Sequence, residues 1–356
     1  MNNMVTATEK KLLMKGNEAV GEGAVIAGCR HYFGYPITPQ NELTAYMSRR
    51  MMDVGGTFIQ SESELAAINM VLGAAAAGAR AMTSSSSPGI SLMQEGISYM
   101  AGQQLPAVIV NVARGGPGLG SIGPAQSDYF QAVKSGGHGD YHCLVMAPST
   151  VQEMMDFTML AFDLADRYQN PALVLTDGLL GQMMEPVVLR QPDRRKPINK
   201  PWTLTGCKGR PPREIKSLYL DLDLLEALNQ RLQEKYARIT QAERRCEHFM
   251  TDGAKILLVA YGIAARICKA VVVTARSNGQ AVGLFRPITL FPYPTPELQQ
   301  AARGVQAVLV VEMSCGQMVE DVRLALGSTV PVSFYGRSGG NVVVPEEVLE
   351  QVQELL

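Results

Sequence analysis

Short apolar runs alternate with longer segments of helical periodicity between Gly16 and Leu189. This alternation is typical of a parallel β-sheet with helices on both faces, because parallel neighbours need a crossover connection that is usually a helix. Glycine, proline, serine or a polar residue bounds each run, as expected for buried central strands. The predicted strands are His31–Gly34, Thr57–Gln60, Ala81–Thr83, Ala107–Val112, Cys143–Ala147 and Ala172–Thr176. We therefore expect an α/β domain in this part of the chain.

The same alternation restarts in the last hundred residues, so a second and smaller α/β domain is expected. Its predicted strands are Ile256–Ala260, Ala281–Phe285 and Ala307–Val311, with helices from Ala264 and after Thr295. A proline-rich, basic connection at 190–213 and a charged, one-sided helix within 218–250 separate the two parts. We expect a first domain at 1–195, a connection with a surface helix at 196–250, and a second domain at 251–356.

Composition and charge exclude several classes of partner. Hydrophobic residues make up 46% of the chain, which excludes a disordered protein and suggests that partner subunits cover extra apolar surface. A net charge of −1 offers no electrostatic surface to nucleic acid or an anionic membrane. The first residues lack the apolar core of a signal peptide, and Leu65–Ala77 is shorter than the roughly 20 residues of a membrane span. A cytoplasmic location is expected.

The cysteines do not form a metal-binding pattern. They are spread along the chain without a CxxC pair or a histidine at metal-ligand spacing. We therefore expect unpaired thiols, and neither a zinc ion nor an iron–sulfur cluster held by this chain.

One candidate loop follows the strand that ends at Gly34 and reads Tyr-Pro-Ile-Thr-Pro-Gln-Asn-Glu. Pro39 suits the first position of a helix, and Thr38 suits its N-cap. Open α/β sheets bind anionic ligands where a strand end leads into a helix N-terminus, since free backbone N–H groups face that side. A capped helix start without a ligand is the alternative for this loop taken alone.

Glu64 is a second candidate, because it opens an almost wholly apolar helix. A helix that is apolar all round must be buried and takes its first carboxylate into a low dielectric, the setting of many functional acids. Glu62 is a rival for this role. Ser61 with Glu64 three residues later also matches a plain capping box, and spacing alone leaves that interpretation open.

Two more polar loops follow predicted strands. One reads Thr-Ser-Ser-Ser-Ser-Pro-Gly over 83–89, and in the other Arg114 precedes a glycine-rich run over 115–120. The glycine-rich run does not match a dinucleotide-binding fingerprint, because it does not open a helix within a βαβ unit. All these loops follow strands of one sheet, so we expect them to gather along its carboxyl edge and build a single cleft.

Taken together, these segments resemble the alpha subunit of 2-oxoacid:ferredoxin oxidoreductases. The resemblance rests on Gly-Tyr-Pro-Ile-Thr-Pro, a glutamate nine residues before Gly73, the Ser-Pro-Gly loop and the Arg-Gly-Gly-Pro-Gly segment. It covers 16–189 closely, and the variants look most like the branched-chain members, which act on 2-oxoisovalerate. The resemblance implies a pyrimidine-type thiamine diphosphate-binding fold, a parallel sheet with helices on both faces, plus a smaller transketolase C-terminal-like α/β domain.

The resemblance also implies roles for single residues. Glu64 matches the family's glutamate that hydrogen-bonds the aminopyrimidine ring of thiamine diphosphate and promotes the tautomer that deprotonates the thiazolium carbon. Thr38 and Arg114 match positions that hold the 2-oxoacid carboxylate, a task suited to a guanidinium. The residues expected to contact the cofactor are Pro36, Ile37, Glu64, Ser87, Pro88 and Gly89.

The rest of the active site is expected on other chains. The family binds Mg²⁺ and the diphosphate with Gly-Asp-Gly and a later Asn, whereas this chain has only Gly139-Asp-Tyr, with Asn170 beyond a predicted helix. The resemblance therefore implies that thiamine diphosphate is shared with a Mg²⁺-binding beta subunit. It also implies a gamma subunit, a ferredoxin-type delta subunit, iron–sulfur clusters on these partners, and coenzyme A and ferredoxin as co-reactants.

Several alternatives stay open. The substrate could instead be 2-oxoglutarate or pyruvate, and the reaction could be a non-oxidative thiamine-dependent decarboxylation. A scaffold subunit that only resembles a pyrimidine domain is the non-catalytic alternative. In the second domain, Arg286, Pro287 and Glu312 either line subunit contacts or serve as ordinary loop residues.

Overall fold

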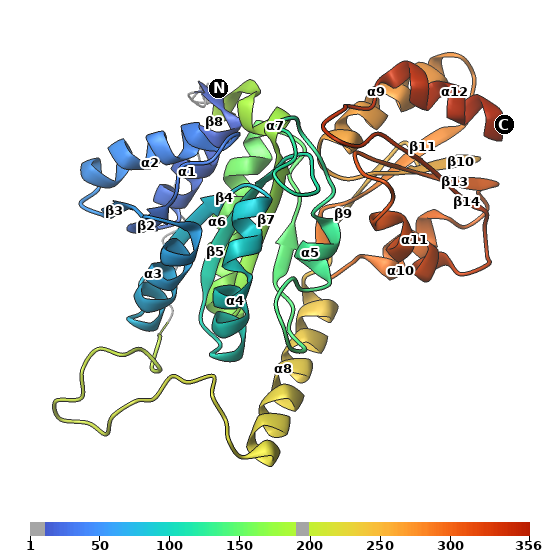
Figure 1. The fold of residues 1–356 in the computed structure, drawn as a ribbon. Helices are drawn as coiled ribbons and strands as arrows, with labels where there is room; N and C mark the ends of the chain where they lie inside the picture. The colour runs from blue at the N-terminus through green and yellow to red at the C-terminus, as the bar shows by residue number, and fades with distance from the viewer. Residues whose placement is uncertain (1–10, 190–198) are drawn as a thin grey trace, which may run out of the picture.

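The computed structural model describes residues 11–189 and 199–356 (Figure 1). Within these residues the strands form three sheets, of seven, five and two strands. The start of the chain, where no signal peptide is expected, lies partly outside the described residues. The same is true of the predicted connection, whose residues 190–198 are not described.

The larger sheet contains the strands predicted in the first part of the chain. They are β2 (His31–Gly34), β3 (Thr57–Gln60), β4 (Ala81–Ser85), β5 (Ala107–Ala113), β6 (Leu144–Met146), β7 (Pro171–Asp177) and, from the second half, β12 (Thr289–Phe291). The order is β12-β6-β7-β5-β4-β2-β3, and the strands from β6 to β3 run parallel. The predicted parallel α/β sheet is confirmed.

Helices cover both faces of this sheet (Figure 1). On one face α3 (Glu64–Ala76) packs against α4 (Pro88–Gly102), and on the other α1 (Gly16–Ile26) packs against α6 (Val151–Tyr168) and α2 (Asn41–Asp53). Every residue of β4, β5 and β7 is buried. Double coverage explains why β5 and β7 appear in the sequence as largely apolar runs, whereas β4 ends in three buried polar residues.

The five-stranded sheet belongs to the second part of the chain. Its elements are β9 (Cys246–Phe249), β10 (Ile256–Val259), α9 (Gly262–Ser277), β11 (Val282–Pro287), α10 (Thr295–Ala301), β13 (Ala307–Glu312), α11 (Met318–Leu326), β14 (Val332–Gly336) and α12 (Pro345–Leu355). The order is β14-β13-β10-β11-β9, parallel except for β9 at the edge. The predicted strands correspond to β10, β11 and β13. The sequence pattern does not predict β9 or β14.

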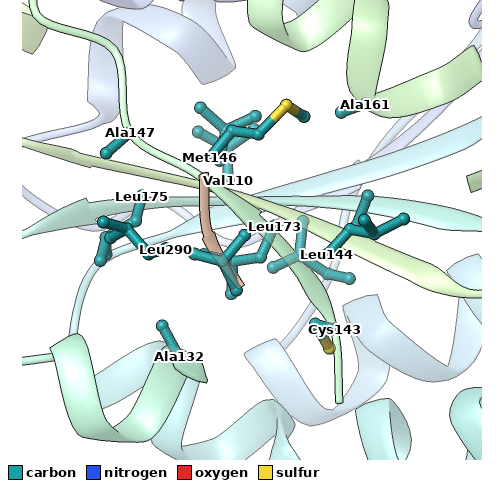
Figure 2. Packing of buried hydrophobic residues seen from close by; sticks show 14 of the residues in the cluster. Val110, Ala132, Cys143, Leu144, Met146, Ala147, Ala161, Leu173, Leu175 and Leu290 are labelled. Atoms are coloured by element: carbon teal, nitrogen blue, oxygen red, sulfur yellow. The ribbon is translucent and has the colours of Figure 1, made fainter. Parts of the chain in front are cut away.

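β12 ties the two parts together. It lies in the second half of the sequence, yet it pairs antiparallel with β6 of the seven-stranded sheet. Leu290 of β12 packs with Leu173 and Leu175 in the core of the first part (Figure 2). The core of the first sheet therefore includes a side chain from beyond residue 251, the position at which we expect the second domain to begin.

The charged helix is α8 (Leu222–Ala242), which runs beside the seven-stranded sheet at the lower right, below α5 (Figure 1). It buries one face, including Leu228, Leu232 and Ile239, as predicted. Tyr236 packs edge-on against Phe291 of β12 and His142. These contacts hold α8 against the edge of the sheet where β12 and β6 pair.

Smaller elements complete the fold. β1 (Lys11–Lys15) and β8 (Met184–Val188) form the two-stranded sheet, and α5 (Tyr129–Val133) and α7 (Gly178–Gln182) are single short helices. Among the helices of 11–189 and 199–356, none has both the length and the apolar character needed to span a bilayer.

The suggestion that Arg286 and Glu312 line subunit contacts is wrong, because both side chains are buried within this chain. Arg286 is 1% exposed and pairs at 2.7 Å with Glu153 of α6 and with Glu247 of β9. Glu312 is completely buried and accepts hydrogen bonds from backbone N–H groups at the start of α11. Arg286 connects the second part of the chain to α6 of the first, and Glu312 stabilises the start of α11.

Candidate functional site

The predicted loops do converge at the carboxyl edge of the seven-stranded sheet. Arg114 donates from Nη1 to the carbonyl of Thr38 at 3.0 Å, and its backbone N–H donates to Ser87 Oγ at 2.9 Å. Gly89 lies against Glu64, since a β-carbon at Gly89 would be 2.5 Å from Glu64 Oε1. The edge therefore brings together side chains that are far apart in the sequence.

Glu64 is the first residue of α3 and is 5% exposed. The capping box with Ser61 is not formed, because Ser63 is the N-cap and its Oγ accepts from Ala66 N–H at 3.2 Å. Among the hydrogen bonds of the described residues, none ends on the Glu64 carboxylate. Neither oxygen of this carboxylate is among the fully buried atoms without a partner, so both keep contact with the open edge and are available to accept a hydrogen bond from a ligand.

α3 itself is not buried all round, which corrects the prediction from its apolar sequence. Leu65 is 46% exposed, and Met70 and Gly73 of the same helix are also exposed. An apolar pattern predicts that a helix is covered, but it does not distinguish cover by the same chain from cover by a partner. The exposed residues lie on the side of α3 away from the buried side that carries Glu64, Ile68 and Val71, and only Leu65 is next to Glu64 in the sequence.

The serine loop packs tightly behind Glu64. Ser85 and Ser86 are completely buried, and their hydroxyls have no hydrogen-bond partner within the described part of the chain. Gly89 leaves no room for a larger side chain, because the Glu64 side chain and Ser85 Oγ occupy the space where a β-carbon would lie. The glycine of the Ser-Pro-Gly sequence is thus needed for Glu64 to reach the edge.

Ser87 is held in an uncommon backbone conformation, with a φ of 21°. Its N–H donates to Asn111 Oδ1 at 3.1 Å, and its hydroxyl donates to Asp128 at 2.6 Å. Burial raises the pKa of Asp128 above its ordinary value, although hydrogen bonds from Ser87 and Asn111 lower it. The Ser87 hydroxyl is therefore fully engaged within the chain, and backbone strain of this kind is typical of functional loops.

Arg114 is 7% exposed and is fixed by backbone carbonyls on two sides. Nη1 donates to Thr38 and Nη2 donates to Leu119, both at 3.0 Å, while Nε is buried without a partner in the described chain. Five N–H donors are available on a guanidinium. The remaining donors give Arg114 the capacity to bind an anion at this edge.

The loop around Thr38 differs from its prediction. α2 begins at Asn41 with Gln40 at the N-cap, so Thr38 is not the N-cap and Pro39 is not the first helical residue. Thr38 is exposed, and its hydroxyl accepts from Asn41 Nδ2 at 3.3 Å. The reason is that residues 37–40 form a turn, closed by a hydrogen bond from Gln40 N–H to Ile37 O at 3.0 Å, and the helix begins only after this turn.

Pro36 and Ile37 lie on the rim of the same edge, the first exposed and the second half-buried. Pro88 begins α4 next to the buried Gly89. The residues predicted to contact the cofactor therefore lie at this edge, either in its loops or in the first turn of α3 or α4.

A buried polar network behind the edge was not predicted from the sequence. The Gln40 side-chain carbonyl accepts from Ser84 at 2.8 Å and from Thr44 at 3.0 Å, and Tyr32 OH bonds Ser84 at 2.7 Å. Burial raises the pKa of Tyr32 to about 12, so the phenol stays neutral. The signal available in the sequence is a polar residue among apolar ones, which also marks Asn111 in the middle of β5.

Other positions named from the sequence do not join the site. Asn170 is completely buried and donates to the carbonyl of His142 at 2.9 Å. Within 11–189 and 199–356, no three acidic, histidine or cysteine side chains gather in a way that could hold a metal ion. A cavity of about 650 Å³ lies elsewhere, between residues 134–142 and α8, and none of the predicted site residues lines it.

The fold and this edge define a thiamine diphosphate-binding α/β subunit. A family model described as pyruvate flavodoxin/ferredoxin oxidoreductase, thiamine diP-bdg, matches residues 22–246. A second, described as pyruvate:ferredoxin oxidoreductase core domain II, matches residues 254–348. The chain belongs to the 2-oxoacid:ferredoxin oxidoreductase family and is a subunit of a thiamine diphosphate-dependent enzyme of this type.

Curated relatives and solved structures agree with this family. Ketoisovalerate oxidoreductase subunit VorB of Methanothermobacter thermautotrophicus is 53% identical over 96% of this chain and 97% of its own length. 2-Oxoglutarate synthase subunit KorA of Methanothermobacter marburgensis is 35% identical over 96% of this chain and 98% of its own. The 2-oxoglutarate:ferredoxin oxidoreductase from Magnetococcus marinus, solved with 2-oxoglutarate, coenzyme A and succinyl-CoA bound, superposes with a TM-score of 0.88 at 26% identity. The match covers 98% of this chain and 65% of that one.

A split gene transketolase, solved as an inactive tetramer, matches with a TM-score of 0.61 at 14% identity, over 96% of this chain and 98% of that one. At this identity the likeness concerns the fold alone. It confirms the transketolase-like architecture that the resemblance implies.

Proposed function

We propose that this subunit acts on a branched-chain 2-oxoacid, with Glu64 as the acid–base group and with Arg114 and Thr38 binding the substrate carboxylate. The observation that carries the proposal is the Glu64 carboxylate, which is 5% exposed and has no hydrogen-bond donor among the described residues. The substrate class is supported by the relatives, because the ketoisovalerate subunit is 53% identical and the 2-oxoglutarate subunit only 35%.

The edge fits the pyrimidine half of thiamine diphosphate. Glu64 presents an unpaired carboxylate, and the orphan hydroxyls of Ser85 and Ser86 are buried close behind it. A dry, positioned carboxylate is suited to accept a hydrogen bond from a ring nitrogen and to exchange a proton with it. When bound, thiamine diphosphate supplies a nucleophilic carbon that attacks the 2-oxo group. The pyrimidine ring would be contacted on its remaining sides by Pro36, Ile37, Pro88 and Gly89.

The surroundings of Arg114 suit a substrate with one carboxylate and an apolar tail. Its free N–H groups would bind the carboxylate beside Thr38. Leu119, whose carbonyl holds Arg114, is 83% exposed, and Ile122 is 67% exposed with its carbonyl near Pro39. Such exposed aliphatic side chains suit a branched acyl chain better than the second carboxylate of 2-oxoglutarate.

We further propose that the open face of α3 and the exposed loops of this edge are covered by a partner beta subunit that holds Mg²⁺ and the diphosphate. The support is the apolar exposure of Leu65 and Met70 on the helix that begins with Glu64. Gamma and ferredoxin-type delta subunits with iron–sulfur clusters would carry electrons to ferredoxin, with coenzyme A accepting the acyl group. The cytoplasmic location and the domain limits at 195 and 250 remain predictions.

The test is an activity panel on the complex assembled with its partner subunits. Ferredoxin reduction would be measured with 2-oxoisovalerate, 2-oxoglutarate and pyruvate, and native mass spectrometry would identify the bound cofactor, metals and subunits. We expect kcat/KM for 2-oxoisovalerate to exceed that for pyruvate by roughly tenfold or more, since one or two additional apolar carbons discriminate at this level. It should also exceed that for 2-oxoglutarate, because the second carboxylate would lie among apolar side chains. A preference for 2-oxoglutarate would overturn the substrate assignment. Decarboxylation without ferredoxin reduction would favour the non-oxidative alternative.

A further inference from the structure

We infer that a glycine turn of the second domain, Gly339–Gly340, positions Arg114 for substrate binding by holding the loop that fixes its guanidinium. The inference rests on the proposed role of Arg114. It makes the second domain part of the substrate-binding apparatus, although none of its residues belongs to the predicted site.

The loop between Arg114 and Pro124 folds back on itself. Gly115 N–H donates to Gly123 O at 2.9 Å, and Ser121 N–H donates to Gly115 O at 2.8 Å. Arg114 forms a bridge with Pro124 across the base of the loop and reaches Leu119 O with Nη2. The loop thus supplies one of the two carbonyls that orient the guanidinium, so a shift of the loop moves Arg114.

The turn of the second domain presses directly on this loop. Ser121 Oγ donates to Gly339 O at 3.1 Å. A β-carbon at Gly123 would lie 2.9 Å from both Cα and O of Gly340, and one at Gly115 would lie 2.8 Å from Gly339 C. The two backbones are so close that a β-carbon at Gly115 or Gly123 would overlap the turn, so the contact requires glycine at these positions.

The turn is itself tied to the rest of the second domain. Arg337 N–H, two residues before it, donates to Glu312 O at 3.2 Å. Next to Glu312, Met313 exchanges two hydrogen bonds with Gln126 of the first domain, at 2.8 and 2.9 Å. The domain is therefore fastened to the first sheet just beyond the loop, and the turn has little freedom to withdraw.

Ordinary packing between domains would produce the same contacts, so the experiment has to separate positioning from stability. Gly340→Ala places a methyl group 2.7 Å from Ser121 Oγ and 3.1 Å from Gly123 Cα, at a φ of +101°. Gly304→Ala is the matched control in the same domain, because Gly304 has a φ of +80° and no atom within 4 Å of its β-carbon position. Both variants carry backbone strain, and only the first disturbs the loop.

In the assembled enzyme we expect Gly340→Ala to raise the KM for the 2-oxoacid roughly tenfold with a smaller change in kcat, because misplacing a binding group by about an ångström has effects of up to 10²-fold. The KM for coenzyme A should stay unchanged. Gly304→Ala should leave both KM values at the wild-type level. Equal 2-oxoacid KM values for the two variants would overturn the inference.

Two further variants keep the result unambiguous. Ser121→Ala removes the hydroxyl that donates to Gly339 and that also accepts from Gly123 N–H at 3.3 Å within the loop, and it should raise the 2-oxoacid KM in the same direction if Gly340→Ala does not assemble. An unchanged KM in Ser121→Ala would then count against the inference. Arg114→Ala tests the underlying assignment: an unchanged 2-oxoacid KM would remove Arg114 from substrate binding altogether. A raised KM in Arg114→Ala together with a normal KM in Gly340→Ala would reject only the role of the turn.

Discussion

Each of the two larger sheets carries a buried glutamate at its carboxyl edge, but only one of the two carboxylates accepts hydrogen bonds from the protein. Glu312, at the end of β13, accepts from the backbone N–H groups of Gln317, Met318 and Val319 and from Ser314 Oγ. Burial raises its pKa, although these hydrogen bonds lower it. Glu64, at the start of α3, is also buried but receives no hydrogen bond from the described residues.

The difference separates a structural acid from a functional one. Glu312 ends one element and caps the next, so its charge is used within the chain. Glu64 also lies at the start of a helix, but Ser63 is the N-cap there, so the Glu64 carboxylate does not cap the helix. A carboxylate that the protein leaves without donors, at an edge open to a partner, is reserved for a ligand. This contrast leads to predictions about which buried charges matter for turnover.

The largest effect is expected from Glu64→Gln in the assembled enzyme. Glutamine keeps the shape but cannot exchange the proton, so turnover should fall by roughly 10²- to 10⁴-fold. The thermal midpoint should hardly change, because no hydrogen bond within the described chain is lost. Glu62→Gln is the control, since Glu62 is an exposed carboxylate two residues away, and it should keep wild-type turnover. Near-normal activity of Glu64→Gln would favour the scaffold alternative.

The same substitution at Glu312 should have the opposite outcome. Glutamine has one oxygen for donors that now bind both, so buried N–H groups at the start of α11 lose their acceptor. Each unsatisfied buried donor costs about 1–3 kcal/mol, and we expect Glu312→Gln to lose about 2–4 kcal/mol of stability. Denaturation of the isolated chain measures this loss, and turnover per folded complex should change little. If Glu312→Gln were as stable as wild type but inactive, the distinction between a structural Glu312 and a functional Glu64 would be wrong.

Lys235 tests whether a buried charged group with few hydrogen bonds must have a catalytic or binding role. It is buried on α8 and donates only to the carbonyl of Gln169, at 3.1 Å, among the hydrogen bonds of the described residues. Burial lowers its pKa to about 7, with Arg238 adding to the effect and Cys143 opposing it. The unfolded chain therefore binds the proton more tightly, and stability should rise as the pH increases from about 7 to 10.

Lys235→Met should remove that pH dependence and raise stability near pH 7 by roughly 1–3 kcal/mol, because methionine fills the same space without a charge. Turnover should be unaffected, since α8 lies away from the edge that holds Glu64. Thermal midpoints at pH 7 and about pH 10, with parallel assays, test both statements. Loss of activity without loss of assembly would show that Lys235 has a function of its own.

The sequence predicts the strands and helices better than it predicts which buried carboxylates accept hydrogen bonds from the protein. Short apolar runs bounded by glycine, proline or polar residues make β2 to β7 recognisable, although β3 lies at the exposed edge of the sheet and not in its buried centre. β12 is not, because three residues carry no periodicity and their partner, β6, lies far away in the chain. The pattern identifies Glu64 but cannot choose between Ser61 and Ser63 as the cap, since both lie within reach of a helix start. That choice decides whether the carboxylate is free.

The sequence pattern also does not predict which loops interact with one another. The sequence indicates that Arg114 lies near an anion site, but the carbonyls of Thr38 and Leu119 that orient it follow from tertiary structure alone. The same is true of Gln40, whose partner Ser84 is held by a different strand. Polar residues in loops carry no periodic signal, so only the fold shows which of them meet.

Asp177 makes the last test, because it combines the location of Glu64 with the hydrogen bonding of Glu312. It ends β7 at the same edge as Glu64, yet its carboxylate accepts from Leu179 and Leu180 N–H at 2.9 and 3.1 Å and from the backbone of Ile263. If hydrogen bonding rather than location marks function, Asp177→Asn should keep normal turnover. A drop as large as that of Glu64→Gln would mean that location decides.

The pH dependence of Asp177→Asn gives the smallest effect. Burial raises the pKa of Asp177 to about 6, against the lowering effect of its backbone hydrogen bonds. The native state therefore binds the proton more tightly than the unfolded chain, and this stabilisation is present below about pH 4 and lost as the pH rises through 6. Asparagine does not titrate, so between pH 4 and pH 7 the variant should gain about 2 kcal/mol relative to wild type. A constant difference in thermal midpoint across that range would show that the Asp177 carboxylate keeps its ordinary ionisation, and that three backbone donors are enough to offset complete burial.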